Sequence, residues 1–448
     1  MLILSSIKNF LLILLILLCL FSLENIVYVN DFILLSIFLS ILFLNLVINP
    51  KWTFLNLLNI ITITLNILGV FAIEHSNSSY YLYEIEQWIS YEGSIPLLFL
   101  YQISFLLGIR FLVKERTLNI LIIKNVRYKS VFLFMLYLLL ILTYIVILKH
   151  KPAPLLGVDR FAYDKDILGV WGQITNILFY FSLGLGILFF KEKNKLYIFL
   201  LLLIQLAFLL KGHKFWNLIE IFFLFFIPYV IYILRARVIK IILVTFLGVG
   251  ALIIAAISIN VYYFPSFEPM DYARQRLSQE GQLWWSTYKN YPESVRSVEI
   301  KNEITTYLNY NEDNQYDVGM YKVMKLNTTP ERFEWKLDKL SRFTYSTPAL
   351  VYYHLGSYLG ILMMCVLGCL FGCWFKLVFY SIIWGDLLTS LILSRAFYII
   401  RKVVKDGDVY KLFSLEILFI ILVASVLYLF SKYSFVVKNK RLSKPKSY

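Results

Sequence analysis

Several cations lie next to long apolar segments of the chain, where a charged side chain is costly unless it meets an anion or a partner. Arginine presents a planar fork that matches two oxygens of a phosphate group, and two or three such forks could hold a diphosphate. A histidine close by could take up a proton near neutral pH. The candidates fall in four places: Arg160; Lys211, His213 and Lys214; Arg274 and Arg276; and His354.

The alternative explanation for these cations is structural. Some of them could pair with Asp159, Asp164 or Asp166, or could touch anionic lipid headgroups. Their origin in four separate connections favours a common anionic ligand instead. Metal-dependent chemistry would need clustered carboxylates, and the expected outer connections offer only Glu84 and Glu86 as a close pair. We therefore expect no metal and no cofactor.

A second pattern indicates a polar cleft. His213, Asn217 and Glu220 are spaced i, i+4 and i+7, so they share one face of a helix that enters an apolar segment. Gln173 and Asn176, spaced i and i+3, do the same in another segment. An ionisable residue in a membrane span normally faces the bundle interior or a watery cavity. The alternative is that these groups only form hydrogen bonds that hold the bundle together.

The composition identifies the elements that must position these residues. Of the 448 residues, 60% are apolar and 16% are charged, whereas soluble domains have roughly 45 to 50% and about 25%. The chain is therefore expected to be an integral membrane protein. Its formal charge of +15 could indicate nucleic acid, but the basic excess lies in short loops and the tail, as is usual in membrane proteins. Nucleic acid is not expected as a partner.

About twelve membrane helices are predicted, because each crossing uses about 20 apolar residues. The predicted fold class is all-α, polytopic, with one large periplasmic loop. The expected domains are helices 1–9 in 1–263, the loop or cap in 264–346, helices 10–12 in 347–431 and a basic tail in 432–448. The expected spans lie at about 10–23, 26–48, 53–73, 95–113, 131–148, 167–190, 196–210, 215–234, 238–262, 347–373, 377–399 and 409–431.

Lysine and arginine collect in connections 110–129, 191–195 and 235–240 and in the tail at 438–446, which fall on one side if there are twelve spans. That side is expected to be cytoplasmic, with both termini inside. The long polar segment 264–346 then lies outside. Its balanced charge and many aromatic residues predict a folded cap, with helices near 278–288 and 330–340. Trp284 and Trp285 fit packing or interfacial anchoring better than a platform for sugars.

Three cysteines repeat along one apolar segment. Cys365, Cys369 and Cys373 are spaced i, i+4 and i+8 and alternate with Gly368 and Gly372. Small residues at this spacing predict a closely packed helix seam. A metal site is the alternative, but no histidine or carboxylate accompanies the cysteines.

Four short motifs resemble those of Wzy-type polymerases of O-antigen and capsular oligosaccharide repeat units. They are the stretch from Arg274 to Trp285 (Arg-Gln-Arg-Leu-Ser-Gln-Glu-Gly-Gln-Leu-Trp-Trp), Gly157 to Phe161, Lys211 to Phe215, and His354 within Tyr-His-Leu-Gly. The number of spans and the late outer loop are similar as well. The resemblance implies a GT-C-like helical fold and metal-independent, inverting glycosyl transfer at the periplasmic face of the bacterial inner membrane.

On this resemblance, both the donor and the acceptor are glycans linked to undecaprenyl diphosphate. The bilayer and a chain-length regulator protein are the other expected partners. Arg160, Arg274 and Arg276 would stabilise the departing diphosphate, and His354, or else Glu280, would be the general base. The residues expected to bind substrate are Lys211, His213, Lys214, Asn217 and Glu220. Glu280 could instead pair with Arg276, and His354 could instead lie at the headgroup level.

Three other functions stay open at this stage. An O-antigen ligase would share the architecture and the chemistry but would use a lipid A core as acceptor. A lipid-linked oligosaccharide flippase would also use cations and many spans, but it would not need a cap of this size. A secondary transporter usually has two related halves, and no internal repeat is evident in this chain.

Overall fold

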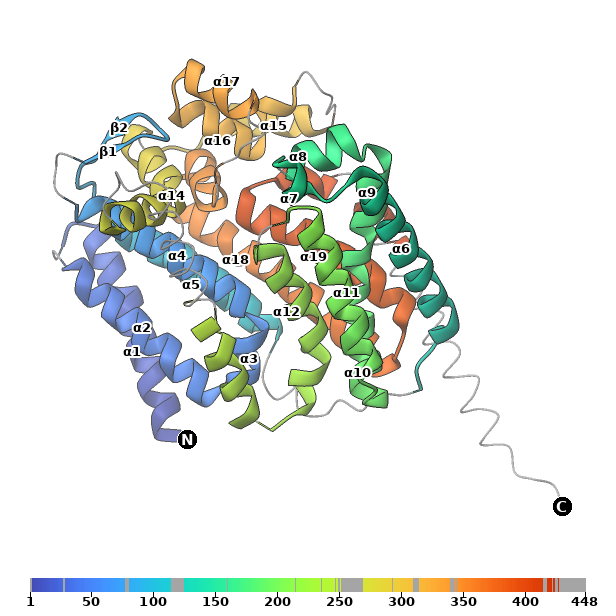
Figure 1. Cartoon of the computed structure of the whole chain (residues 1–448). Helices are drawn as coiled ribbons and strands as arrows, with labels where there is room; N and C mark the ends of the chain where they lie inside the picture. Colours follow the sequence, from blue (N-terminus) through green and yellow to red (C-terminus); the bar gives the residue numbers. More distant parts are fainter. Residues whose placement is uncertain are drawn as a thin grey trace. The chain divides into compact units, whose positions relative to one another are not determined.

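The computed structural model of the chain consists of helices apart from a single short hairpin in the part that it describes (Figure 1). Lys214 and Asp159, the basic tail 432–448 and most of the expected ninth span lie outside the described residues. The structure describes residues 2–26, 29–76, 80–113, 125–158, 160–213, 215–234, 236–245, 247–248, 250, 269–291, 293–308, 314–338, 343, 345–413, 417–420, 422–423 and 426.

Within those residues, seven helices are long and apolar enough to cross a membrane. They are Ile3–Leu23, Asp31–Ile48, Leu57–Glu74, Ile95–Leu112, Lys129–Leu156, Val170–Glu192 and Thr347–Trp384. Leu196–Leu210 and Trp216–Tyr232 are shorter apolar helices. The expectation of a mostly helical membrane protein is therefore confirmed at this level. The total of twelve spans and the side on which the long polar segment lies stay predictions.

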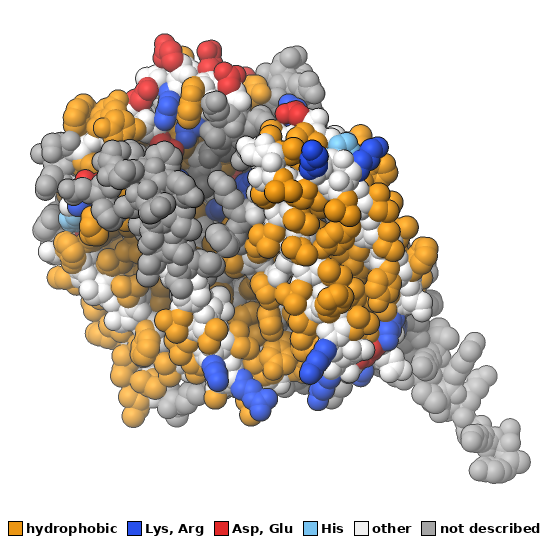
Figure 2. Space-filling view, viewed as in Figure 1, with side chains coloured by type: hydrophobic (Ala, Val, Ile, Leu, Met, Phe, Trp, Pro, Cys, Tyr) orange, Lys and Arg blue, Asp and Glu red, His pale blue; other side chains and the backbone are white. Residues whose placement is uncertain are grey.

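The outer surface of the helices is apolar, as lipid contact requires. On α6 (Lys129–His150), Phe134 is 67% exposed and Leu148 is 73% exposed. Figure 2 shows hydrophobic side chains over much of the visible helical surface and acidic side chains gathered at the end that carries α17 (Pro330–Asp338). Glu331 and Glu334 are exposed there. Exposed apolar and exposed acidic side chains are thus concentrated on different helices.

The chain divides into two compact units. Unit 1 comprises 1–117, 233–373 and 400–412, and unit 2 comprises 118–232, 374–399 and 413–448. The described elements of unit 1 are α1 (Leu2–Leu23), α2 (Asp31–Ile48), α3 (Pro50–Leu55), α4 (Leu57–Glu74), β1 (Tyr81–Leu82), β2 (Gln87–Trp88), α5 (Ile95–Leu112), α14 (Pro269–Asn290), α15 (Ser297–Leu308), α16 (Gly319–Asn327), α17, and parts of α18 (Thr347–Trp384) and α19 (Leu387–Asp406).

Glycines allow close helix crossings in unit 1. A Cβ atom on Gly281 of α14 would lie 2.2 Å from the backbone nitrogen of Val70 on α4, so the two backbones touch. A Cβ on Gly108 of α5 would lie 2.2 Å from the carbonyl oxygen of Cys365 on α18, and the thiol of Cys369 donates to Gly108 O at 3.5 Å. The predicted cysteine–glycine seam is therefore confirmed, with α5 as its partner.

The polar segment is a folded layer of helices. Its apolar centre combines the hairpin and α4 with α14, α16 and α17, through buried residues such as Ile73, Leu82, Trp285 and Val323. Trp284 and Trp285 are both 0% exposed, which confirms that they pack rather than offer a surface to sugars. The strands pair antiparallel, with Tyr81 opposite Trp88.

The expected boundary at residue 373 is wrong. Helix α18 runs on to Trp384, because Lys376 alone does not end an otherwise apolar helical run. The turn comes at Gly385, whose φ of 61° suits glycine, and α19 follows.

Unit 2 contains α6, α7 (Ala153–Leu156), α8 (Arg160–Ala162), a π-helical turn (Tyr163–Ile167), α9 (Val170–Asn176), α10 (Phe181–Glu192), α11 (Leu196–Leu210) and α12 (Phe215–Tyr232), with the remaining parts of α18 and α19. Helices α10 and α12 cross closely at Gly186, whose added Cβ would lie 2.1 Å from the carbonyl oxygen of Phe225. Buried Ala153, Tyr163 and Leu168 form a small core beneath the connection between α6 and α9.

Candidate functional site

The strongest candidate for acid–base chemistry in unit 1 is a histidine held by a carboxylate. His354 Nε2 in the first part of α18 contacts Glu303 Oε2 of α15 directly. Both side chains are buried, at 10% and 4% exposure. His354 Nδ1 has no hydrogen-bond partner among the described residues. A carboxylate on one ring nitrogen and an open position on the other is the arrangement in which a histidine accepts a proton.

Glu303 is held firmly in its ionised form. Its Oε1 accepts hydrogen bonds from Tyr307 Oη at 2.7 Å and from the backbone N–H of Gly319 at 2.8 Å, and Lys322 Nζ lies 3.7 Å from Oε2. Burial alone would raise the pKa of Glu303, but the contact with His354, the Gly319 N–H and the charge of Lys322 together outweigh that effect. The pKa therefore lies below the ordinary value, and the carboxylate is ready to stabilise an imidazolium.

The helix that carries His354 is broken just after it. Gly356 has φ 63° and ψ −164°, which interrupts the regular hydrogen bonding of α18. The released backbone groups find new partners: Arg296 N donates to His354 O at 3.0 Å, Tyr101 Oη donates to Gly356 O at 2.6 Å, and Ser357 N donates to Glu293 Oε1 at 2.8 Å. A break satisfied in this way inside an apolar helix is typical of binding and transport sites in membrane proteins.

The predicted arginine pair lies on α14. Arg274 is 41% exposed at its side chain, with Asp271 Oδ1 3.9 Å from Nη1 and the ring of Tyr80 6.0 Å from the guanidinium carbon. Arg276 is exposed and donates to Tyr272 Oη at 3.1 Å and to Gln279 Oε1 at 2.9 Å. The ion pair of Arg274 is long and exposed, and the partners of Arg276 are uncharged. Both guanidinium groups can therefore bind an anion.

Glu280, the second candidate base, lies on the same helix. Its backbone carbonyl accepts a hydrogen bond from Asn66 Nδ2 of α4 at 2.6 Å. Its charge also acts on Tyr345, which is 6% exposed. Burial is the main cause that raises the pKa of Tyr345 well above its ordinary value, so the phenol stays protonated and can donate a hydrogen bond.

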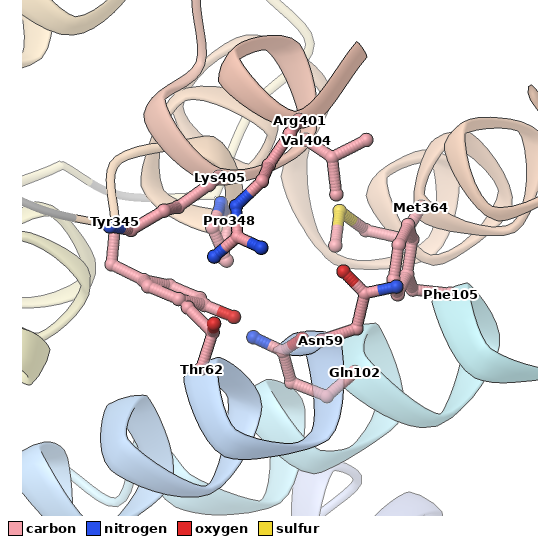
Figure 3. Close-up of a pocket in the computed structure, with 10 residues that line it drawn as sticks. All are labelled: Asn59, Thr62, Gln102, Phe105, Tyr345, Pro348, Met364, Arg401, Val404 and Lys405. Atoms are coloured by element: carbon pink, nitrogen blue, oxygen red, sulfur yellow. The ribbon is translucent and has the colours of Figure 1, made fainter. Parts of the chain in front are cut away.

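Sequence reasoning missed a polar cavity next to Tyr345, between α4, α5, α18 and α19. In Figure 3 the guanidinium group of Arg401 points into this cavity, with Tyr345 on one side and the amides of Asn59 and Gln102 opposite. Arg401 is 6% exposed. The space is sufficient for roughly one water molecule. The ten lining residues are Asn59, Thr62, Gln102, Phe105, Tyr345, Pro348, Met364, Arg401, Val404 and Lys405.

Unit 2 holds the other predicted cluster. Lys211 Nζ, at the end of α11, lies 3.0 Å from Asp164 Oδ1. It also donates to Asn176 Oδ1 at 2.7 Å, to Thr175 Oγ1 at 2.8 Å and to Gly172 O at 3.2 Å. Lys211 therefore pairs with an aspartate, as the structural alternative allowed, and that aspartate is Asp164. Burial lowers the pKa of Lys211, and Asp164 opposes that shift.

His213 completes this cluster. Asn217 Nδ2 lies 2.7 Å from His213 Nδ1 and donates to it, which leaves the proton of the neutral ring on Nε2, 3.6 Å from Asp164 Oδ2. Burial lowers the pKa of His213, so the neutral form predominates at pH 7. Helix α12 begins at Phe215, so His213 lies before it and reaches Asn217 from the preceding turn. The predicted helix face therefore does not include His213. Glu220, also on that helix, is buried at 6% exposure.

Arg160 lies beside the same cluster. Its Cβ is 3.7 Å from the position that a Cβ on Gly212 would take, and its charge contributes to the lowered pKa of His213. Arg160 and Lys211 thus belong to unit 2, whereas Arg274, Arg276, Glu280 and His354 belong to unit 1.

Residues 313–421 match the model of a family of unknown function, DUF6418. The matched segment contains His354 and Arg401 but neither Glu303 nor Arg274. No curated protein and no solved structure gives a significant match to the chain.

Proposed function

We propose that this chain is a membrane glycosyltransferase that joins lipid-linked oligosaccharide repeat units into O-antigen or capsular polysaccharide. The proposal includes about twelve spans, an outer cap formed by 264–346 and cytoplasmic termini in the bacterial inner membrane. The observation that carries it is the pairing of His354 with Glu303, because it supplies the oriented general base that the transfer needs.

In the proposed reaction, the acceptor sugar hydroxyl gives its proton to His354 Nδ1 as its oxygen bonds to the anomeric carbon of the donor. The bond from that carbon to the diphosphate oxygen breaks, and the diphosphate leaves with the electron pair, so the configuration inverts. Glu303 is a positioning residue that stabilises the imidazolium. Nδ1 is buried in this structure, so the acceptor reaches it only when neighbouring side chains part.

Arg274 and Arg276 are proposed to stabilise the negative charge that grows on the departing diphosphate. Arg160 is a further candidate for this role. Lys211, His213, Lys214, Asn217 and Glu220 are proposed to bind the substrate. No cofactor or metal is part of the proposal.

The test is the polysaccharide ladder from cells that lack the gene and carry a plasmid copy of the wild type, His354→Ala, Glu303→Gln or the control His150→Ala. His150 ends α6 in unit 2 and has no role in the proposed mechanism. We expect long chains to vanish without the gene and in the His354→Ala cells, with core plus one repeat unit remaining, and the control to restore full length. A core without any repeat unit would contradict polymerisation and favour a ligase or a flippase.

A further inference from the structure

The cluster in unit 2 has the composition of an anion site, and it is filled by the protein's own carboxylate. Asp164 Oδ1 is 3.0 Å from Lys211 Nζ, and its Oδ2 accepts from Asn176 Nδ2 at 3.3 Å and faces His213 Nε2 at 3.6 Å. Three cationic or N–H donors therefore surround one carboxylate, as they would surround a phosphate.

The donors are built into the fold, whereas the carboxylate lies at the edge. The Lys211 side chain is 1% exposed and is also held by Thr175 and Asn176, and Asn217 fixes the ring of His213. The Asp164 side chain is 22% exposed. Because the donor side chains are anchored and the Asp164 carboxylate is partly exposed, Asp164 could leave while the donors keep their positions.

Asp164 belongs to a segment that has hinge-like backbone at both ends. Gly157 and Gly169 have φ of 64° and 54°, and within the part of the chain that the structure describes no atom lies within 4 Å of a Cβ added at either position. These glycines are therefore needed for their backbone conformation and not for space. Between them, Tyr163–Ile167 forms a π-helical turn, a feature that is frequent at functional sites.

We propose that Lys211, Asn176 and His213 form an oxyanion-binding site that Asp164 occupies with its own carboxylate until a phosphate-bearing ligand displaces it. Asp164 is then an internal competitor, and its departure moves the segment between Gly157 and Gly169. The identification of the ligand as the diphosphate of the lipid-linked substrate rests on the proposed function. The site itself does not.

The competitor role predicts that removing the Asp164 charge tightens anion binding. If Asp164 fills the site in about nine molecules of ten, its loss should strengthen apparent binding about tenfold. A purely structural ion pair predicts the opposite, because Asp164→Asn would leave Lys211 buried without its partner and phosphate would not compensate.

The experiment measures thermal unfolding of the purified, detergent-solubilised full chain at rising concentrations of inorganic pyrophosphate. We expect Asp164→Asn to be less stable than the wild type without ligand, and to regain stability at pyrophosphate concentrations about tenfold lower than those that affect the wild type. Asp166→Asn, an exposed acid two residues away, is the matched control and should behave as the wild type. Asp164→Asn with Lys211→Met should lose the response to pyrophosphate.

An Asp164→Asn protein that is destabilised and gains nothing from pyrophosphate would overturn the proposal. Vesicles of phosphatidylglycerol form a second arm, because a response to these vesicles but not to pyrophosphate would identify a lipid headgroup as the ligand and overturn displacement by diphosphate. Binding here is measured without any polysaccharide. If the purified protein responds to pyrophosphate but cells without the gene still make long polysaccharide chains, the proposed function is refuted. The anion-binding site would still stand.

Discussion

The side chains of His354 on α18 and Glu303 on α15 form a buried pair, which ties an apolar helix to the polar segment. A buried pair contributes little when it is compared with apolar residues of the same size, but removing one partner leaves an uncompensated charge. Tyr307, Gly319 and Lys322 surround the same carboxylate, so its position is determined from several sides. Such a pair suits a function that depends on the orientation of the His354 ring.

Replacing Glu303 with Gln is expected to lower the free energy of unfolding by about 3 kcal/mol, because the pair and two hydrogen bonds to an ionised group are weakened together. Thermal unfolding of the purified protein measures this change. The double variant with His354→Gln should lose less than the sum of the two single variants, since the two side chains are in contact. Additive losses would contradict direct coupling.

The stability of the wild type is expected to fall in acid through Glu303. Its folded pKa lies below the ordinary value of 4.5, so its contribution is fully present above that pH and is lost as the pH falls through the folded pKa. Glu303→Gln carries no such proton equilibrium. The difference in melting temperature between wild type and variant should therefore stay constant above the ordinary pKa of 4.5 and narrow as the pH falls below it. An equal difference at all pH values would show that Glu303 is not ionised in the folded protein.

The glycine at the crossing of α14 and α4 offers a test of packing. Gly281→Ala is expected to cost about 1 to 3 kcal/mol, because its Cβ would meet the Val70 backbone nitrogen at 2.2 Å and a backbone cannot move aside easily. Gly248→Ala, where no atom of the described residues lies within 4 Å of the added Cβ, is the control. Thermal unfolding measures the stability of both variants. Equal stability would contradict the close crossing of α14 and α4 at Gly281.

The parts of this architecture that follow from hydropathy and spacing could be predicted from the sequence. The apolar helices and the cysteine–glycine seam on α18 are examples. Each depends on a local period, and local periods are visible in one sequence.

The contacts that define the candidate sites depend on tertiary structure. Nothing around Glu303 distinguishes it from the other acids of the polar segment until α15 packs against α18. The choice of Asp164 over Asp166 as the partner of Lys211 follows from the π-helical turn. Arg401 was not predicted because the expected span ended at residue 399, whereas α19 continues to Asp406. Tyr345, which lines the same cavity as Arg401, comes from a distant part of the sequence.

The role of the α14 arginines can be tested by charge and by shape. Arg274→Ala and Arg276→Ala are each expected to abolish chain elongation while the protein still inserts normally, because the departing diphosphate would lose a cation in the transition state. Lysine at either position should restore elongation only in part, since an ammonium group cannot contact two phosphate oxygens as a planar fork does. Arg237→Ala, an exposed arginine elsewhere in unit 1, serves as the control for the loss of one surface charge. Length distributions on a polysaccharide gel, at matched protein levels in the membrane fraction, measure the effect. Full-length polymer in both alanine variants would remove Arg274 and Arg276 from the mechanism, whereas full rescue by lysine would retain their charge and exclude a bidentate contact.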